Sequence, residues 1–155
     1  MKKAAGILYF LLTYIISLGQ SETNNFSTRD TVFNMPASQK VVLRVTAPTF
    51  YLTAGNPDTA SRPMIVFLTG AGEGNAAYDS NQLKANIAVY GPHYWLNNGW
   101  DGRVELGNGR HYPIIVSINW NRSLSGRPWQ LLPAVKWLKQ RYHPKNIHVT
   151  GLSAG

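Results

Sequence analysis

Residues 146–155 read Asn-Ile-His-Val-Thr-Gly-Leu-Ser-Ala-Gly, a strand-like run followed by a serine between two glycines. In this G-x-S-x-G spacing the chain turns sharply from strand to helix, and the serine hydroxyl projects from the turn. Glycine suits the flanking positions because the turn leaves no room for a Cβ beside the serine and needs unusual backbone angles. The pattern predicts that Ser153 is a nucleophile on an elbow, with Gly151 and Gly155 as the elbow glycines.

The segments before the elbow predict an α/β fold. Residues 64–68 and 114–118 are continuous apolar runs, as expected for strands buried on both faces of a parallel sheet. Residues 129–142 carry apolar side chains at helical spacing, and Pro144 ends this helix before the strand at 146–150. Strand, loop, strand, helix, strand is typical of a mostly parallel sheet with flanking helices.

Weaker patterns complete the prediction. Residues 41–45 and 50–53 read as short strands, and residues 82–89 as a helix. The region around Trp95 and Trp100 is expected to be an irregular insertion.

A glycine-rich loop, Thr-Gly-Ala-Gly-Glu-Gly-Asn, follows the first buried strand at residues 69–75. Such a loop donates a main-chain N–H to an oxyanion, and the residue after the serine, Ala154, gives the other donor. We expect Gly70 and Gly72 to be the glycines that shape this loop. Asn119 and Trp120 end the second buried strand, and ligands bind at the carboxyl ends of such strands. We therefore expect Asn119 and Trp120 to lie in the substrate pocket.

The composition excludes several functions. The 155 residues are 44% hydrophobic and 14% charged, which is typical of a folded domain. The formal charge of +8 is scattered rather than gathered into a basic stripe, so no nucleic-acid partner is expected. The chain has no cysteine and four dispersed histidines, so neither disulfides nor a metal site is expected, and no cofactor is implied.

The first 19 residues have the features of a secretory signal peptide. Lys2 and Lys3 precede an apolar run of about 15 residues, which is shorter than the roughly 20 residues of a membrane span. An uncleaved membrane anchor is the alternative. We expect cleavage after Gly19, a secreted or periplasmic protein without a membrane contact, a linker or edge segment at 20–40 and the domain at 41–155.

Three segments, 67–73, 135–138 and 149–155, resemble the amino-terminal half of secreted α/β-hydrolases of the esterase and depolymerase-like branch, often described as predicted peptidases or phospholipase/carboxylesterases. The resemblance implies that Ser153 is the nucleophile and that the main-chain N–H groups of Ala154 and Ala71 form the oxyanion hole. Thr69 stands where this family usually has a histidine.

In this fold the triad order is serine, then an acid, then histidine. All four histidines precede Ser153. We therefore expect that the chain is truncated at the elbow and that these 155 residues alone are inactive and poorly stable, because the strand at 146–150 would be a bare edge.

The leading hypothesis is an exported serine hydrolase that cleaves small-molecule or polymer esters through an acyl-enzyme. Five tryptophans and eight tyrosines leave a non-catalytic carbohydrate-binding module as an alternative, which would be an all-β protein. A pseudoenzyme fragment is the third hypothesis.

Overall fold

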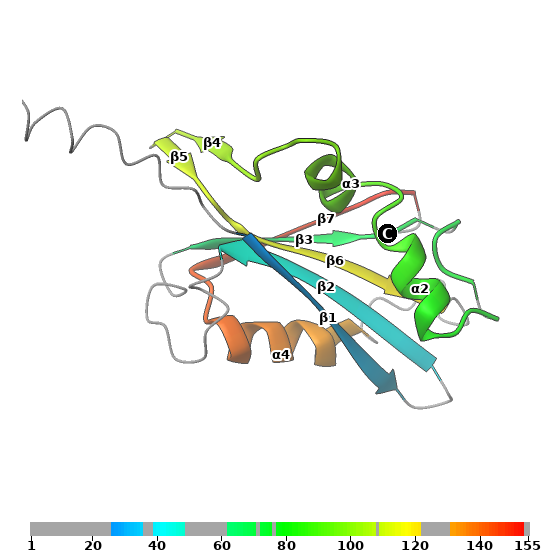
Figure 1. The fold of residues 1–155 in the computed structure, drawn as a ribbon. Helices are drawn as coiled ribbons and strands as arrows, with labels where there is room; N and C mark the ends of the chain where they lie inside the picture. Colours follow the sequence, from blue (N-terminus) through cyan, green and yellow to red (C-terminus); the bar gives the residue numbers. More distant parts are fainter. Residues whose placement is uncertain are drawn as a thin grey trace, which may run out of the picture.

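The computed structural model of the protein describes residues 26–35, 39–48, 62–70, 72–75, 77–107, 109–121 and 131–153. Its helices and strands form an α/β arrangement with few helices (Figure 1). In chain order they are β1 (Phe26–Met35), β2 (Gln39–Pro48), β3 (Pro63–Leu68), α2 (Ser80–Asn86), α3 (Pro92–Asn97), β4 (Val104–Leu106), β5 (Gly109–His111), β6 (Ile114–Trp120), α4 (Leu132–Tyr142) and β7 (Asn146–Gly151).

The main sheet has five strands in the order β1-β2-β6-β3-β7, and it is mixed. β2 runs antiparallel to both β1 and β6, whereas β3 runs parallel to both β6 and β7. The expectation of a mostly parallel sheet is wrong for the β1–β2 half. Met35 ends β1 and Gln39 begins β2, and this connection is far shorter than the dozen or so residues of a parallel crossover.

The larger core lies between the sheet and α4, which covers the face opposite α2 and α3 (Figure 1). Because side chains alternate along a strand, every second residue of β2, β3 and β6 points into this layer. Its buried residues are Val41, Leu43, Val45, Ala47, Met64, Val66, Ile114, Val116, Ile118, Trp120, Leu131, Ala134, Leu138 and Tyr142. Apart from the hydroxyl of Tyr142 and the indole nitrogen of Trp120, the side-chain atoms of this layer are apolar. Burial of apolar surface therefore holds α4 on the sheet.

The opposite face joins α2 and α3 to the sheet through polar contacts as well. Its buried apolar cluster is small and consists of Val42, Leu83 and Ile87. The strand residues Thr46, Ser117 and Asn119 on this face are all buried. Thr46 and Ser117 are hydrogen-bonded to His93 of α3, and Asn119 donates to a carbonyl of α2. Buried polar groups therefore fix where these two helices sit.

Most of the expected elements are confirmed. β3, β6 and β7 match three predicted strands, and α4 matches the predicted helix at 129–142 over its described residues. α2 begins two residues before the helix predicted at 82–89 and ends three residues before its end. The strand predicted at 41–45 is part of the longer β2. The strand predicted at 50–53 and the start of the predicted helix at 129–130 lie outside the described residues, as do the proposed signal segment and residues 20–25.

The expectation for the region around Trp95 and Trp100 is wrong in part. The segment around Trp95 is not wholly irregular, because α3 forms there with Pro92 in its first turn. A glycine on each side makes such a short helix hard to recognise in the sequence. β7 lies at the edge of the described sheet, as expected for this strand, and only Ile147 is half-covered. No helix in the described ranges is long and apolar enough to cross a membrane.

Candidate functional site

Ser153 lies on a turn directly after β7 and is exposed. Its φ of 55° is in the left-handed region, which only one other non-glycine residue of the described chain, His143, occupies. Such a conformation costs an ordinary residue about 1–2 kcal/mol. A strained serine after a parallel strand is the backbone geometry of a nucleophile turn.

The glycine-rich loop lies against this turn. The Leu152 N–H donates to the carbonyl of Leu68 over 3.1 Å, which joins the turn to the end of β3. A Cβ on Gly70 would come within 3.3 Å of the Leu152 carbonyl oxygen and 2.8 Å of Glu73 Oε2. A side chain at position 70 would therefore crowd the turn, and the Leu152 main chain would have to shift by a few tenths of an ångström. A Cβ on Gly72 would meet nothing within 4 Å, so sterics set no such requirement there.

Some of the other predicted site residues lie outside the described ranges. Ala71, Ala154 and Gly155 are outside them, so the oxyanion-hole assignment stays a prediction. Gly151 is the last residue of β7, and it pairs with Leu68 in the parallel ladder.

Asn119, which the sequence predicts to lie in the substrate pocket, does not line either of the two pockets described below. It is fully buried, and its amide makes three hydrogen bonds. The Thr69 hydroxyl donates to Asn119 Oδ1 over 2.8 Å, and Asn119 Nδ2 donates to the Glu73 and Leu83 carbonyls over 2.9 Å each. Asn119 thus connects both ends of the glycine-rich loop to β6 and α2.

Trp120 does not line either of these two pockets. It is 6% exposed and belongs to the core layer under α4. The alternation of side chains along β6 places Trp120 on the opposite face from Asn119. Two consecutive strand residues cannot both face one site, and here neither is exposed.

The loop also carries a buried acid whose role the sequence did not indicate. Glu73 is 6% exposed, and its Oε2 is the buried side-chain atom of the described chain that has no hydrogen-bond partner. An unpaired buried polar atom costs about 1–3 kcal/mol. Asn119 holds the main chain of Glu73, which keeps this side chain beside Gly70.

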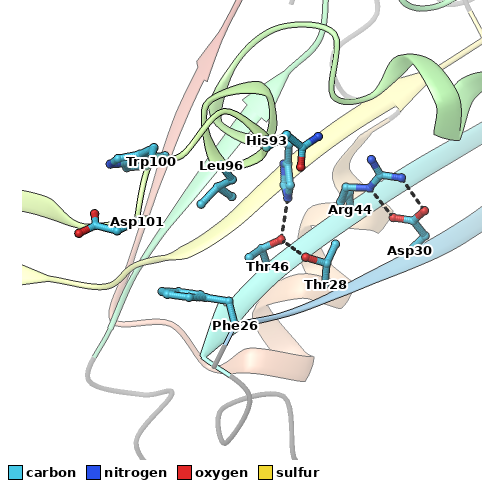
Figure 2. A pocket seen from close by; sticks show the side chains of 10 residues that line it. Phe26, Thr28, Asp30, Arg44, Thr46, His93, Leu96, Trp100 and Asp101 are labelled. Carbon is cyan, nitrogen blue, oxygen red and sulfur yellow. Dashed lines mark hydrogen bonds and ion pairs between the residues drawn. The ribbon is translucent and has the colours of Figure 1, made fainter. Parts of the chain in front are cut away.

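A polar pocket of about 500 Å³ opens on the β1–β2 side of α3 (Figure 2). At its base, His93 Nδ1 lies 2.6 Å from Ser117 Oγ and His93 Nε2 lies 3.0 Å from Thr46 Oγ1. Thr46 Oγ1 is in turn 2.7 Å from Thr28 Oγ1. Burial of the imidazole, with a smaller contribution from Arg44, lowers the pKa of His93 to about 4, and Asp30 opposes this shift. His93 is therefore neutral near pH 7.

Arg44 and Asp30 form an ion pair at the rim of the same pocket (Figure 2). Arg44 Nε and Nη2 donate to the two Asp30 carboxylate oxygens over 2.8 and 2.9 Å. The charges of Arg44 and Asp30 are thus paired with each other, and neither residue offers an unpaired charge to a ligand in this pocket.

An aromatic groove of about 470 Å³ lies on the other side of α3. Its lining residues are Phe67, Gly91, Pro92, Trp95, Trp100 and Thr150. Phe67 and Thr150 are register partners one residue before the ends of β3 and β7. The groove therefore lies at the carboxyl ends of the parallel strands, on the same side as the loop and the serine turn.

The four histidines lie on four different elements. Both ring nitrogens of His93 are bonded to hydroxyl groups of the sheet. His143 ends α4 with φ 43°. His148 lies on the exposed edge strand, and His111 lies in the β4–β5 hairpin. Because a lone serine hydroxyl is a weak nucleophile, a nucleophilic role for Ser153 would require a base beside it.

No protein-family model matches this sequence. No curated protein matches it either. Among solved structures, an esterase of Pyrococcus furiosus (Pf2001) is a distant match, with 17% sequence identity and a TM-score of 0.41. The match covers 84% of this chain and 43% of the esterase chain, so this chain spans less than half of that protein.

Proposed function

We propose that this chain carries the nucleophile of a serine hydrolase that cleaves carboxylic esters, and that it forms the amino-terminal half of an α/β-hydrolase domain. The observation that supports this most strongly is the left-handed backbone of Ser153 directly after parallel strand β7. The close contact between that turn and Gly70 supports it further, since it brings a loop of main-chain N–H groups beside the serine.

In the proposed reaction, Ser153 Oγ attacks the ester carbonyl carbon while a general base takes the hydroxyl proton. The main-chain N–H groups of Ala71 and Ala154 donate to the resulting oxyanion. The alcohol leaves with the proton from the base, and water then hydrolyses the acyl-enzyme by the same steps. The base must come from residues outside the described ranges or from another chain.

Localisation and partners belong to the same proposal. The positively charged and apolar residues 1–19 support export, followed by cleavage of that segment and release from the membrane. The substrate is a small-molecule or polymer ester, and nucleic acid is not a partner. An all-β carbohydrate-binding module does not fit the α/β arrangement of the described chain.

A serine-reactive fluorophosphonate tests the proposal. Because the base in this proposal comes from outside the described residues, the complete natural protein is purified and incubated with the probe. It is then digested, and the modified peptide is identified by mass spectrometry. We expect the label on Ser153 and its loss in Ser153→Ala. The matched control is Ser80→Ala at the start of α2, which should leave labelling unchanged. A folded protein that takes no label at Ser153 would instead favour the pseudoenzyme hypothesis.

A further inference from the structure

The aromatic groove and the serine turn share one strand. Thr150 lines the groove, and Ser153 follows it by three residues. At 3.8 Å between consecutive Cα atoms, their Cα atoms are at most about 11 Å apart. A group held in the groove is therefore within reach of a nucleophile on the turn, as one end of a small ester would be.

The groove is built by backbone features that present aromatic side chains. The N–H groups of Asn98 and Trp100 both donate to the carbonyl of Trp95, over 3.0 and 2.9 Å. Gly99, with φ 96°, allows this tight end to α3. The main-chain positions of the two tryptophans are thus fixed relative to each other, and the Trp95 side chain is 60% exposed.

The floor of the groove depends on a second glycine. Gly91 has φ 79°, and a Cβ there would lie 2.4 Å from the Phe67 ring. The main chain before α3 therefore lies directly against Phe67, which leaves the ring as part of the lining.

The lining offers little hydrogen bonding. Thr150 contributes its only side-chain hydroxyl, and Trp95 contributes an indole N–H. The indole N–H of Trp100 donates to the Arg103 carbonyl over 3.0 Å and is already used. A sugar would need several donors and acceptors beside a stacking ring, whereas a flat apolar ring needs none. The lining thus favours an aromatic ligand over a carbohydrate.

We infer that this groove is a binding subsite for a flat aromatic group of the ester substrate, with Trp95 as the exposed ring that contacts it. This inference rests on the proposed function for the identity of the ligand as an ester. The binding itself does not require Ser153 to react. The subsite and the nucleophile can therefore be tested separately.

The test measures binding to the Ser153→Ala protein, which cannot turn the ligand over. Methyl benzoate is titrated while tryptophan fluorescence is recorded, with methyl cyclohexanecarboxylate as a non-aromatic ligand of the same size. An aromatic pair is worth about 0.5–1.5 kcal/mol beyond its buried area, so we expect the benzoate to bind about fivefold more tightly. Methyl glucoside should not bind measurably.

A pair of variants locates the site. Adding Trp95→Ala should weaken benzoate binding about tenfold, and because Trp95 is 60% exposed the protein should remain folded. Tyr90→Ala is the matched control, since Tyr90 is 53% exposed but outside the lining, and it should change binding less than about twofold. Equal effects of the two substitutions overturn the inference, as does tighter binding of the cyclohexane ester or the glucoside.

Failure of this inference differs from failure of the proposed function. If the fluorophosphonate labels Ser153 but benzoate does not bind, the protein is a hydrolase that acts on a different substrate class. If benzoate binding depends on Trp95 but Ser153 is not labelled, the groove binds aromatic groups and Ser153 is not a nucleophile.

Discussion

Asn119 Nδ2 donates to the main-chain carbonyl of Glu73 over 2.9 Å, which connects the middle of the sheet to the far end of the glycine-rich loop. The same nitrogen donates to the Leu83 carbonyl of α2, and the Asn119 carbonyl oxygen accepts from Thr69 at the near end of the loop. One fully buried amide thus holds the loop in the form in which Gly70 meets the serine turn. Asn119 is a positioning residue for the candidate site rather than a ligand contact.

Replacing Asn119 should therefore destabilise the protein and loosen the loop. Asn119→Leu removes three buried hydrogen bonds, each worth about 1 kcal/mol net, so we expect a loss of about 3 kcal/mol in the free energy of unfolding. Urea denaturation followed by tryptophan fluorescence measures this. The control is Asn98→Leu, because the Asn98 amide is exposed and makes one hydrogen bond, to the Tyr94 carbonyl. Similar losses in both variants would contradict the positioning role.

Stability should fall in mild acid because of His93. Its pKa is about 4 in the folded protein and 6.5 as the ordinary value, so the unfolded chain binds more protons between these pH values. The contribution of His93 to the free energy of unfolding is therefore full above pH 6.5 and decreases as the pH falls towards 4. Below pH 4 this group causes no further loss of stability. The full difference is about 3 kcal/mol.

The measurement is the free energy of unfolding against pH for the wild-type protein and His93→Gln. The variant should lose the part of the slope between about pH 6.5 and 4 that comes from this imidazole. His148→Gln is the matched control, since His148 is exposed on β7, and it should keep the wild-type slope. A wild-type slope in His93→Gln would show that other groups cause the acid sensitivity.

Gly91→Ala should be strongly destabilising. Its φ of 79° with ψ of −160° is a conformation that essentially only glycine adopts, and the added Cβ would overlap the Phe67 ring. Strain and overpacking together predict a loss of about 3 kcal/mol in thermal or urea unfolding. Gly107→Ala should change stability by less than about 0.5 kcal/mol, because nothing lies within 4 Å of its added Cβ. An unchanged Gly91→Ala protein would mean that Phe67 moves freely.

The attachment of α4 can be tested with two leucines of the same helix. Leu138 is fully buried against the sheet, whereas Leu132 is 52% exposed. Leu138→Ala should cost about 2–5 kcal/mol in the free energy of unfolding, and Leu132→Ala less than about 1 kcal/mol. If the two losses were equal, α4 would not lie on the sheet by the face described here.

Local sequence was enough to locate most elements. The apolar runs of β3 and β6 and the helical spacing of α4 were predicted because burial on two faces or on one helical face leaves a periodic pattern. The strand before Ser153 and the glycines around it were recognisable for the same reason, since a sharp turn restricts which residues can stand there. By contrast, α3 was missed because six residues between glycines carry too little periodicity.

The sequence by itself determined where the strands, the turn and the glycine-rich loop lie along the chain, because those features depend on neighbouring residues. Only the tertiary structure decided that β2 lies antiparallel to β6, that Asn119 is buried beneath the loop, and that His93 meets Ser117 across the sheet. Each of these brings together residues that are far apart in the chain, and the hydrogen bonds and apolar area that select such pairings exist only once the sheet has formed.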